Sequence, residues 1–218
     1  KEVGGDFYDF YFVNKDTLAF LIADVSGKGI PAAMFMMNAK AVLKSYAESG
    51  LDVNKVFTLT NEKLCEGNDA GMFVTAWMGF LNTETGEVTF ANAGHNPPLV
   101  RHADGSFEYL KVRAGFVLAG MEGVKYRKNE LQLAANDVIY LYTDGVTEAT
   151  NINDELYGED RLLALLNANK EASMEELCKL VKEDVFAFAG EAPQFDDITM
   201  LALKYCGATA PTNQEEAL

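Results

Sequence analysis

Four stretches of this chain place an aspartate where an apolar or glycine-rich run ends or begins. The clearest is the continuous apolar run at residues 17–23 (TLAFLIA), which predicts a buried strand and stops at Asp24. The other three are Gly4-Gly5-Asp6, Thr143-Asp144-Gly145 and Phe195-Asp196-Asp197. Aspartate is rarely buried unless it is paired or binds a metal. We therefore expect distant parts of the chain to meet at one shared acidic site.

A cluster of carboxylates without histidine or cysteine favours hard divalent cations such as magnesium or manganese. Carboxylates held at strand ends can bridge two cations about 3.5–4 Å apart, and such a pair can orient water for attack on phosphorus. The chain has two histidines, and Gly27-Lys28-Gly29 lacks the spacing of a nucleotide-binding P-loop. The pattern therefore favours metal-dependent hydrolysis of a phosphate ester.

Each motif also has an ordinary structural explanation when it is taken alone. The sequence around Asp144 is typical of a turn, and Asp6 follows two glycines that favour one as well. Asp24 is harder to explain in this way, because it ends a strongly apolar strand before a glycine-rich loop. Asp196 and Asp197 are adjacent like charges, which repel each other unless a cation lies near.

Strand and helix patterns follow one another in an order that favours a single α+β domain with many antiparallel strands. We expect strands at residues 7–13, 17–23, 73–81, 87–93, 99–102, 106–110, 126–133, 137–142 and 198–205, and helices at 31–47, 54–66, 158–168 and 173–189. The domain is expected to span residues 1–206. The polar tail 207–218 is expected to be disordered. Because the chain opens almost inside a motif, we expect it to be an N-terminally truncated part of a longer protein.

Composition excludes several classes of partner. A net charge of −15 argues against nucleic acid and against docking of this domain on an anionic membrane surface. The three cysteines (Cys65, Cys178 and Cys206) are far apart in sequence and odd in number, which indicates a reducing compartment. No apolar stretch reaches the ~18 residues of a membrane-spanning helix, and no signal peptide is visible. We expect a cytoplasmic domain, either free or part of a membrane-anchored protein.

Five sequence blocks occur together in one order: GGDFYDF, ADVSGKGIPAAMFM, NAGHNPPL, LYTDGVTEATN and FDDITML. With these blocks the chain resembles the SpoIIE/RsbU-like branch of the metal-dependent PPM protein serine/threonine phosphatases, from Glu2 to about Tyr205. The resemblance implies a β-sandwich of two antiparallel sheets flanked by helices, in α-β-β-α layers. It also implies a metal centre at one end of the sandwich.

The resemblance further implies a site for two manganese or magnesium ions, with the ligands Asp6, Asp24, Val25 (through its backbone carbonyl), Asp144 and Asp196. Asp24 is expected to bridge the two ions and to be catalytic. Asp197 is expected to support catalysis from behind the ligands, and Gly145 to keep the turn at Asp144 open.

The chain departs from many eukaryotic relatives in two respects. Ser26 stands where they carry a histidine that is a candidate general acid, and their phosphate-binding arginine would precede the first residue of this chain. Metal-bound water is therefore the expected proton source. His95 lies in a Gly/Asn/Pro loop, where we expect it to hold the loop together with Asn92 and Asn96. Lys28 is expected to be a solvated loop lysine, the alternative being contact with a phosphate or a partner.

The first long helix begins with Met34, Met36 and Met37, which we expect to pack in the core. Helices that follow the Asp24 motif in this branch are thought to switch activity, because a small shift of the helix could move Asp24 or Val25. Observing this helix in one fixed position in every partner complex would count against that hypothesis.

The resemblance implies an enzyme that hydrolyses phosphoserine or phosphothreonine on a protein. Its expected substrate is an anti-sigma-factor antagonist with a STAS fold in bacterial partner switching. The expected partners also include an N-terminal sensory or regulatory domain and a second copy of the chain in a homodimer. Two alternatives remain open. One is a catalytically silent module that only binds, and the other is a hydrolase of a different phosphate ester.

Overall fold

A computed structural model describes residues 4–103, 105–194 and 196–208. The strands are β1 (Phe7–Asn14), β2 (Thr17–Val25), β3 (Val74–Asn82), β4 (Glu87–Ala93), β5 (Leu99–Arg101), β6 (Phe107–Tyr109), β7 (Asn129–Gln132), β8 (Val138–Tyr142) and β9 (Met200–Lys204). The helices are α1 (Gly29–Glu48), α2 (Val53–Cys65), α3 (Asp144–Thr147), α4 (Glu159–Ala168) and α5 (Met174–Ala189).

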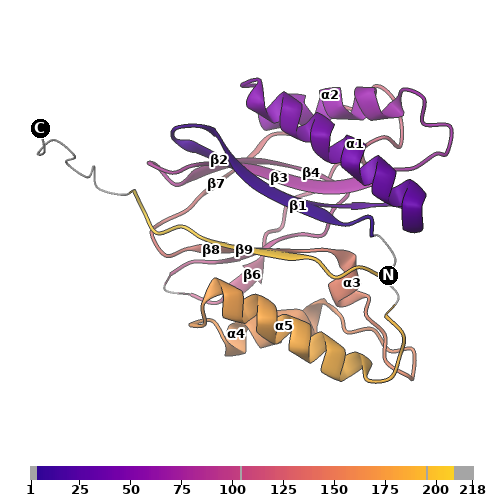
Figure 1. The fold of residues 1–218 in the computed structure, drawn as a ribbon. Helices are drawn as coiled ribbons and strands as arrows, with labels where there is room; N and C mark the ends of the chain where they lie inside the picture. The colour runs from indigo at the N-terminus through magenta and orange to yellow at the C-terminus, as the bar shows by residue number, and fades with distance from the viewer. Residues whose placement is uncertain (1–3, 104, 195, 209–218) are drawn as a thin grey trace, which may run out of the picture.

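Two antiparallel sheets stack face to face, and helices cover both outer faces (Figure 1). In the first sheet the strand order is β1-β2-β3-β4-β7, and in the second it is β6-β5-β8-β9. Helices α1 and α2 cover the first sheet, while α4 and α5 cover the second (Figure 1). The predicted α+β sandwich with α-β-β-α layers is therefore confirmed.

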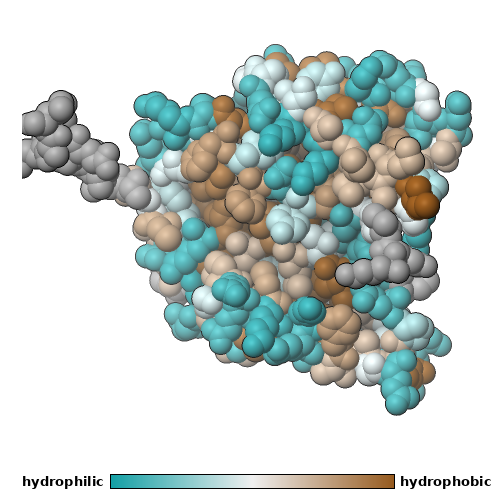
Figure 2. All heavy atoms as spheres, viewed as in Figure 1, coloured by the Kyte–Doolittle hydropathy of each residue, from teal (hydrophilic) through white to brown (hydrophobic). Residues whose placement is uncertain are grey.

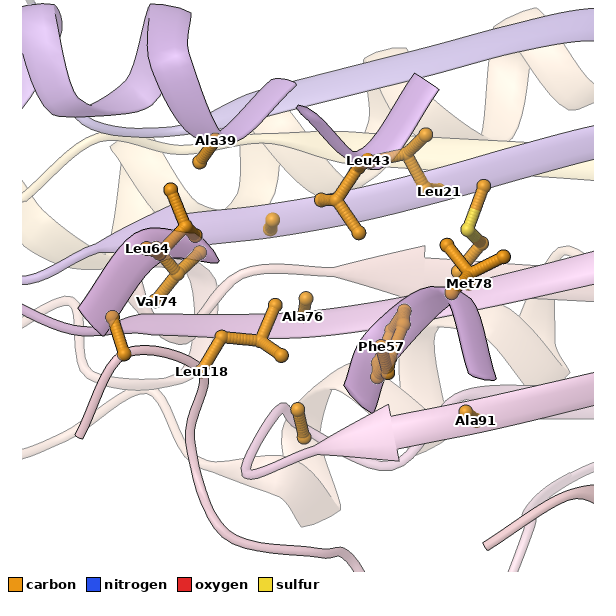
Figure 3. Packing of buried hydrophobic residues seen from close by; sticks show 14 of the residues in the cluster. Leu21, Ala39, Leu43, Phe57, Leu64, Val74, Ala76, Met78, Ala91 and Leu118 are labelled. Atoms are coloured by element: carbon orange, nitrogen blue, oxygen red, sulfur yellow. The ribbon is translucent and has the colours of Figure 1, made fainter. Parts of the chain in front are cut away.

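Three clusters of buried side chains fill the three interfaces between these four layers. Successive residues of a strand point to opposite faces of the sheet, so β2 contributes to two clusters. Its Leu21 lies next to Leu43 of α1 in the cluster beneath α1 and α2 (Figure 3). Its Phe20 and Ile22 lie in the cluster between the two sheets. The continuous apolar run before Asp24 thus reflects a strand that is covered on both faces.

Aromatic rings fill much of the space between the sheets. The ring centroids of Phe20 and Trp77 are 5.3 Å apart, and those of Trp77 and Phe90 are 5.2 Å apart. A Cβ on Gly79 would lie 2.8 Å from the Trp77 ring and 2.9 Å from the Phe20 ring. The glycine therefore leaves the room that these rings occupy.

One side of the sandwich exposes aromatic residues of the outer strand β1. Tyr8, Phe10 and Phe12 are 49%, 59% and 61% exposed, and they share the strand face that points toward the second sheet. Figure 2 shows tan and brown side chains between the two helical layers on this side. The second sheet therefore leaves this part of β1 uncovered.

Several expectations from the sequence need correction. Met36 packs against the core, but Met34 and Met37 are 68% and 69% exposed, because they lie on the outer side of α1. Strand β7 starts at residue 129 and not at 126. The turn expected after β8 is the short helix α3. Most of the tail that we expected to be disordered, residues 209–218, lies outside the described residues. Within the described ranges, no helix is long and apolar enough to span a membrane.

Candidate metal centre

Strand pairing in the first sheet brings two of the predicted aspartates together. Asp6 directly precedes β1, and Asp24 is the penultimate residue of β2. Because Phe7 pairs with Ala23, the two carboxyl groups lie side by side at the same end of the sheet. Thr143, which follows β8 in the second sheet, donates a hydrogen bond from its Oγ1 to Asp6 Oδ2 at 2.7 Å. This bond ties the two sheets together at the acidic end.

The second sheet supplies the other two aspartates. Asp144 is the first residue of α3, immediately beyond the end of β8, and Asp196 lies shortly before β9. The pairing of Tyr142 with Met200 aligns the end of β8 with the start of β9. Each sheet therefore contributes two of the four predicted carboxylates to one end of the sandwich.

The carboxyl groups of Asp6 and Asp24 form a hydrogen-bonded pair in which Asp24 is the donor. The pKa of Asp24 is raised to about 8, first by burial and then by the Asp6 carboxylate and the two aspartates of the second sheet. Burial also raises the pKa of Asp6, to about 6, although hydrogen bonds from Thr199 and Thr143 act in the opposite direction. The site therefore lacks positive charge for the number of carboxylates that it holds.

The second sheet's side of the cluster shows the same electrostatic pattern. Burial raises the pKa of Asp144, and the neighbouring Asp196 adds to the effect. Burial, Asp144 and Asp196 also raise the pKa of Glu148, which follows α3. The sequence reasoning missed Glu148, because nothing in its local sequence indicates that a short helix turns it toward the cluster.

Glycines allow the segments that carry the aspartates to touch. A Cβ on Gly5 would lie 2.7 Å from the backbone carbonyl oxygen of Val25 and 3.5 Å from Asp24 Oδ1, so only a glycine fits here between β1 and the end of β2. A Cβ on Gly4 would overlap the carboxylate of Asp197, and one on Gly145 would overlap the backbone oxygen of Asp197. The expected roles of Val25, Asp197 and Gly145 are therefore compatible with where these residues lie.

The loop after β2 is held by two contacts. Ser26 Oγ accepts a hydrogen bond from the Phe73 N–H at 2.9 Å, and the Ser26 N–H donates one to the Phe73 carbonyl at 2.9 Å. Lys28 Nζ lies 3.7 Å from Asp196 Oδ2. Lys28 is thus paired with a predicted ligand and is not simply solvated, while Ser26 has a structural role that does not require proton transfer.

His95 is buried and connects the two sheets beside the cluster. Its Nδ1 lies 3.0 Å from Thr75 Oγ1 in the first sheet, and its Nε2 lies 3.1 Å from the Tyr142 carbonyl in the second. Since a carbonyl only accepts, Nε2 carries the proton and Nδ1 accepts from the threonine. The Asn92 side chain bonds both the N–H and the carbonyl of His95. The expected structural role of His95 and Asn92 in this loop is confirmed.

The buried position of His95 predicts a loss of stability in acid. Burial lowers its pKa from 6.5 to about 4, so below pH 6.5 the unfolded chain binds a proton that the folded chain does not. Lowering the pH from 6.5 to 5 should therefore reduce the free energy of unfolding by about 2 kcal/mol. Urea unfolding at the two pH values measures this reduction. The contribution should be absent in His95→Gln, and an equal pH dependence in the two proteins would contradict this account.

The donor set fits a hard divalent cation. It consists of carboxylates and one backbone carbonyl, and burial and neighbouring carboxylates raise the pKa values of Asp6, Asp24 and Asp144, an effect that a bound cation would offset. In the described part of the chain, no group of three or more Asp, Glu, His or Cys side chains lies close enough together to hold a metal ion as it stands.

A cavity of about 220 Å³ adjoins the acidic cluster, between α3 and the C-terminal end of α5. Gly145 and Asp196 belong to both the cavity wall and the cluster. The rest of the wall is largely apolar and includes Val185, Phe186 and Ile198. The acidic cluster is therefore bordered on one side by an apolar recess.

The layered sandwich with carboxylates at one end has the fold of PP2C phosphatase domains. The SiaA-PP2C domain of Pseudomonas aeruginosa superposes with a TM-score of 0.82 at 24% identity, covering 93% of this chain and 81% of that one. RsbX in complex with magnesium superposes with a TM-score of 0.67 at 18% identity, covering 94% and 88%.

The chain belongs to the SpoIIE family, whose model, described as Stage II sporulation protein E, matches residues 14–205. It is 31% identical over 205 residues to the phosphoserine phosphatase RsbU of Bacillus subtilis, covering 94% of this chain and 60% of RsbU. It is 31% identical over 230 residues to protein IcfG of Synechocystis, covering 93% of this chain and 36% of IcfG. The predicted SpoIIE/RsbU-like phosphatase branch is thereby confirmed, and the chain spans 60% of the length of RsbU and 36% of the length of IcfG.

Proposed function

We propose that this domain is a metal-dependent phosphatase that hydrolyses phosphoserine or phosphothreonine on a protein. The observation that carries the proposal is the convergence of Asp6, Asp24, Asp144 and Asp196 from both sheets at one end of the sandwich. Membership of the SpoIIE family and the similarity to phosphoserine phosphatase RsbU support it. The magnesium complex of RsbX, a neighbour in fold, supports a divalent cation.

In this proposal Asp6, Asp24, Asp144, Asp196 and the carbonyl of Val25 hold two manganese or magnesium ions. When bound, the ions supply the positive charge that polarises both water and the phosphoryl group. Asp24 lies between the carboxylates of the two sheets, which suits it to a bridging role. Thr143 orients Asp6 through its hydrogen bond, and Asp197 packs behind the ligands against Gly4.

Among the described residues, neither His95 nor Ser26 is placed to donate a proton to the leaving group. Both ring nitrogens of His95 are occupied, and its pKa of about 4 keeps the ring neutral at physiological pH. Ser26 is hydrogen-bonded to the Phe73 backbone. We therefore assign the proton to water, in agreement with the absence of a histidine at position 26.

We further propose that the substrate is a phosphorylated STAS-type antagonist of an anti-sigma factor, in a bacterial partner-switching pathway. The resemblance to RsbU supports this assignment. The relatives are longer than this chain, which supports an additional regulatory domain in the whole protein. A cytoplasmic location and a homodimer belong to the same proposal. Helix α1 begins five residues after Asp24, so a movement of α1 is a direct way to control the ligand.

The test is the hydrolysis of p-nitrophenyl phosphate and of a phosphorylated STAS protein with manganese, with magnesium and with EDTA. We expect turnover with either metal and none with EDTA, because the carboxylates then lack their positive partners. Turnover that survives EDTA would overturn the two-metal assignment. If wild type binds the STAS protein but hydrolyses neither substrate in the presence of manganese, the silent binding module is the better description. Hydrolysis of the aryl phosphate alone would instead favour a different phosphate ester as the substrate.

A further inference from the structure

One segment of this acidic chain is strongly basic. Residues 111–128 contain five lysines or arginines and one glutamate, a net charge of +4 within a chain whose net charge is −15. Three of the five cations line a single cavity of about 220 Å³, namely Arg113, Lys125 and Arg127. The other wall residues are uncharged and include the amide side chains of Asn92 and Asn129. This cationic pocket contrasts in charge with the rest of the domain.

Local structure fixes the three cations on one side of the pocket. Lys125, Arg127 and Asn129 alternate along the extended segment that leads into β7, so they share one face of it. Tyr126 points to the opposite face, where it is buried with its hydroxyl 3.1 Å from the Val117 carbonyl. The buried tyrosine therefore directs its two neighbours outward into the pocket.

The opposite wall is fixed by the first sheet. The N–H of Gly115, two residues after Arg113, donates a hydrogen bond to the Asn92 carbonyl at 2.8 Å. Within the described residues, none of the three cations makes an ion pair with Asp or Glu. Because their charges are not neutralised by the domain itself, they are available to an external anion.

The pocket lies close to the metal centre. Asn92 bonds His95, and His95 bonds the carbonyl of Tyr142, the residue before Thr143. In the sheet, the pocket-wall residue Asn92 pairs with Trp77, and Trp77 pairs with Ile22, two residues before Asp24. Two strand spacings therefore separate this wall of the pocket from β2, which corresponds to roughly 10 Å. An extended peptide covers that distance in about three residues.

We propose that the cationic pocket binds carboxylate side chains of the protein substrate, at two to four residues from its phosphorylated serine or threonine. This inference rests on the proposed phosphatase function and adds to it a preference for acidic sequences. Without such a pocket, the negative charge of the domain would repel an acidic substrate. The pocket therefore explains how an acidic phosphatase domain can accept an acidic phosphoprotein.

The test compares two phosphoserine peptides, one with glutamates and one with glutamines three residues on either side of the phosphoserine. The pocket variant is the triple substitution Arg113→Gln, Lys125→Gln and Arg127→Gln. The matched control is Lys128→Gln, which removes the same kind of charge from the same segment. Lys128 directly follows Arg127 and is absent from the pocket wall. Its Nζ lies 3.9 Å from Asp52 Oδ1. We measure kcat/KM for each peptide and, by fluorescence anisotropy, the binding of each labelled peptide.

We expect the wild type to prefer the glutamate peptide. The triple variant should lose roughly 10-fold in both kcat/KM and affinity for that peptide, because it removes the contribution of three exposed charge pairs. For the glutamine peptide and p-nitrophenyl phosphate, kcat/KM of the triple variant should differ from wild type by less than about 2-fold. The Lys128→Gln control should differ by less than about 2-fold for every substrate. Added salt should weaken the preference of the wild type for the glutamate peptide.

Equal losses of kcat/KM for both peptides in the triple variant, or no loss for either, would overturn the proposal. So would a variant that changes only inhibition by inorganic phosphate, because the pocket would then bind the product. Absence of all hydrolysis by wild type would contradict the phosphatase function, while anisotropy would still test the pocket.

Discussion

Substitution of Asp24 by asparagine is expected to abolish manganese-dependent turnover. The lost charge should lower kcat/KM for p-nitrophenyl phosphate by about 10³-fold or more, the effect of roughly 4 kcal/mol of transition-state stabilisation. The same substitution should stabilise the metal-free protein by about 1–2 kcal/mol. The reason is that burial and neighbouring carboxylates oppose ionisation of Asp24, as its pKa of about 8 shows.

Activity assays and urea unfolding in EDTA check the two halves of this prediction separately. Asp16→Asn is the matched control, because Asp16 lies in the turn between β1 and β2, at the other end of these strands, and pairs with Lys15. It should leave turnover unchanged within about 2-fold, as expected for an exposed ion pair. An Asp24→Asn protein that keeps its metal-dependent turnover, or that is less stable than wild type in EDTA, would contradict the account of the site.

The second large effect is expected from His95→Ala. The substitution leaves the Tyr142 carbonyl and the Thr75 hydroxyl without partners and opens a cavity at a residue that is 4% exposed. The expected cost is about 3 kcal/mol of stability. Because the carbonyl that His95 holds is two residues from Asp144, catalysis should fall as well. A displacement of about 1 Å at that ligand would cost about 10²-fold in turnover.

Thermal unfolding and kinetics of the same preparations test the role of His95. Thr75→Val removes one of its two ring partners and should cost less, about 1 kcal/mol. His95→Gln can replace part of the bonding and should recover part of the turnover. If His95→Ala unfolds at the same temperature as wild type, the hydrogen bonds of His95 between the sheets do not contribute to stability. Normal stability combined with lost turnover would instead indicate a direct catalytic role.

The sequence was sufficient to predict the layered fold and the meeting of the four aspartates at one end of it. The apolar run that stops at Asp24 predicts a buried strand that stops at a polar site, and the family blocks order the remaining elements around it. Strand ends also bring Asp6 and Asp24 together by simple antiparallel pairing. These features depend on local pattern and on chain order, which are visible without coordinates.

Features that depend on contacts between distant segments could not be predicted in this way. The hydrogen bond from Thr143 to Asp6 joins residues 137 positions apart. The contact between Lys28 and Asp196 depends on how the loop after β2 meets the loop before β9. Met34 and Met37 are apolar, and so they were assigned to the core, yet α1 buries only one of its faces. In each case the local sequence is compatible with two arrangements, and only the three-dimensional packing determines which one forms.

The apolar recess between α3 and α5 has a consequence for chemical inhibition of this centre. Compounds that imitate phosphate must carry negative charge, which hinders passage through membranes and invites binding to other phosphatases. A compact uncharged compound seated against Val185, Phe186 and Ile198 would lie next to Asp196 without imitating phosphate. Its selectivity would come from the end of α5, and not from the acidic cluster.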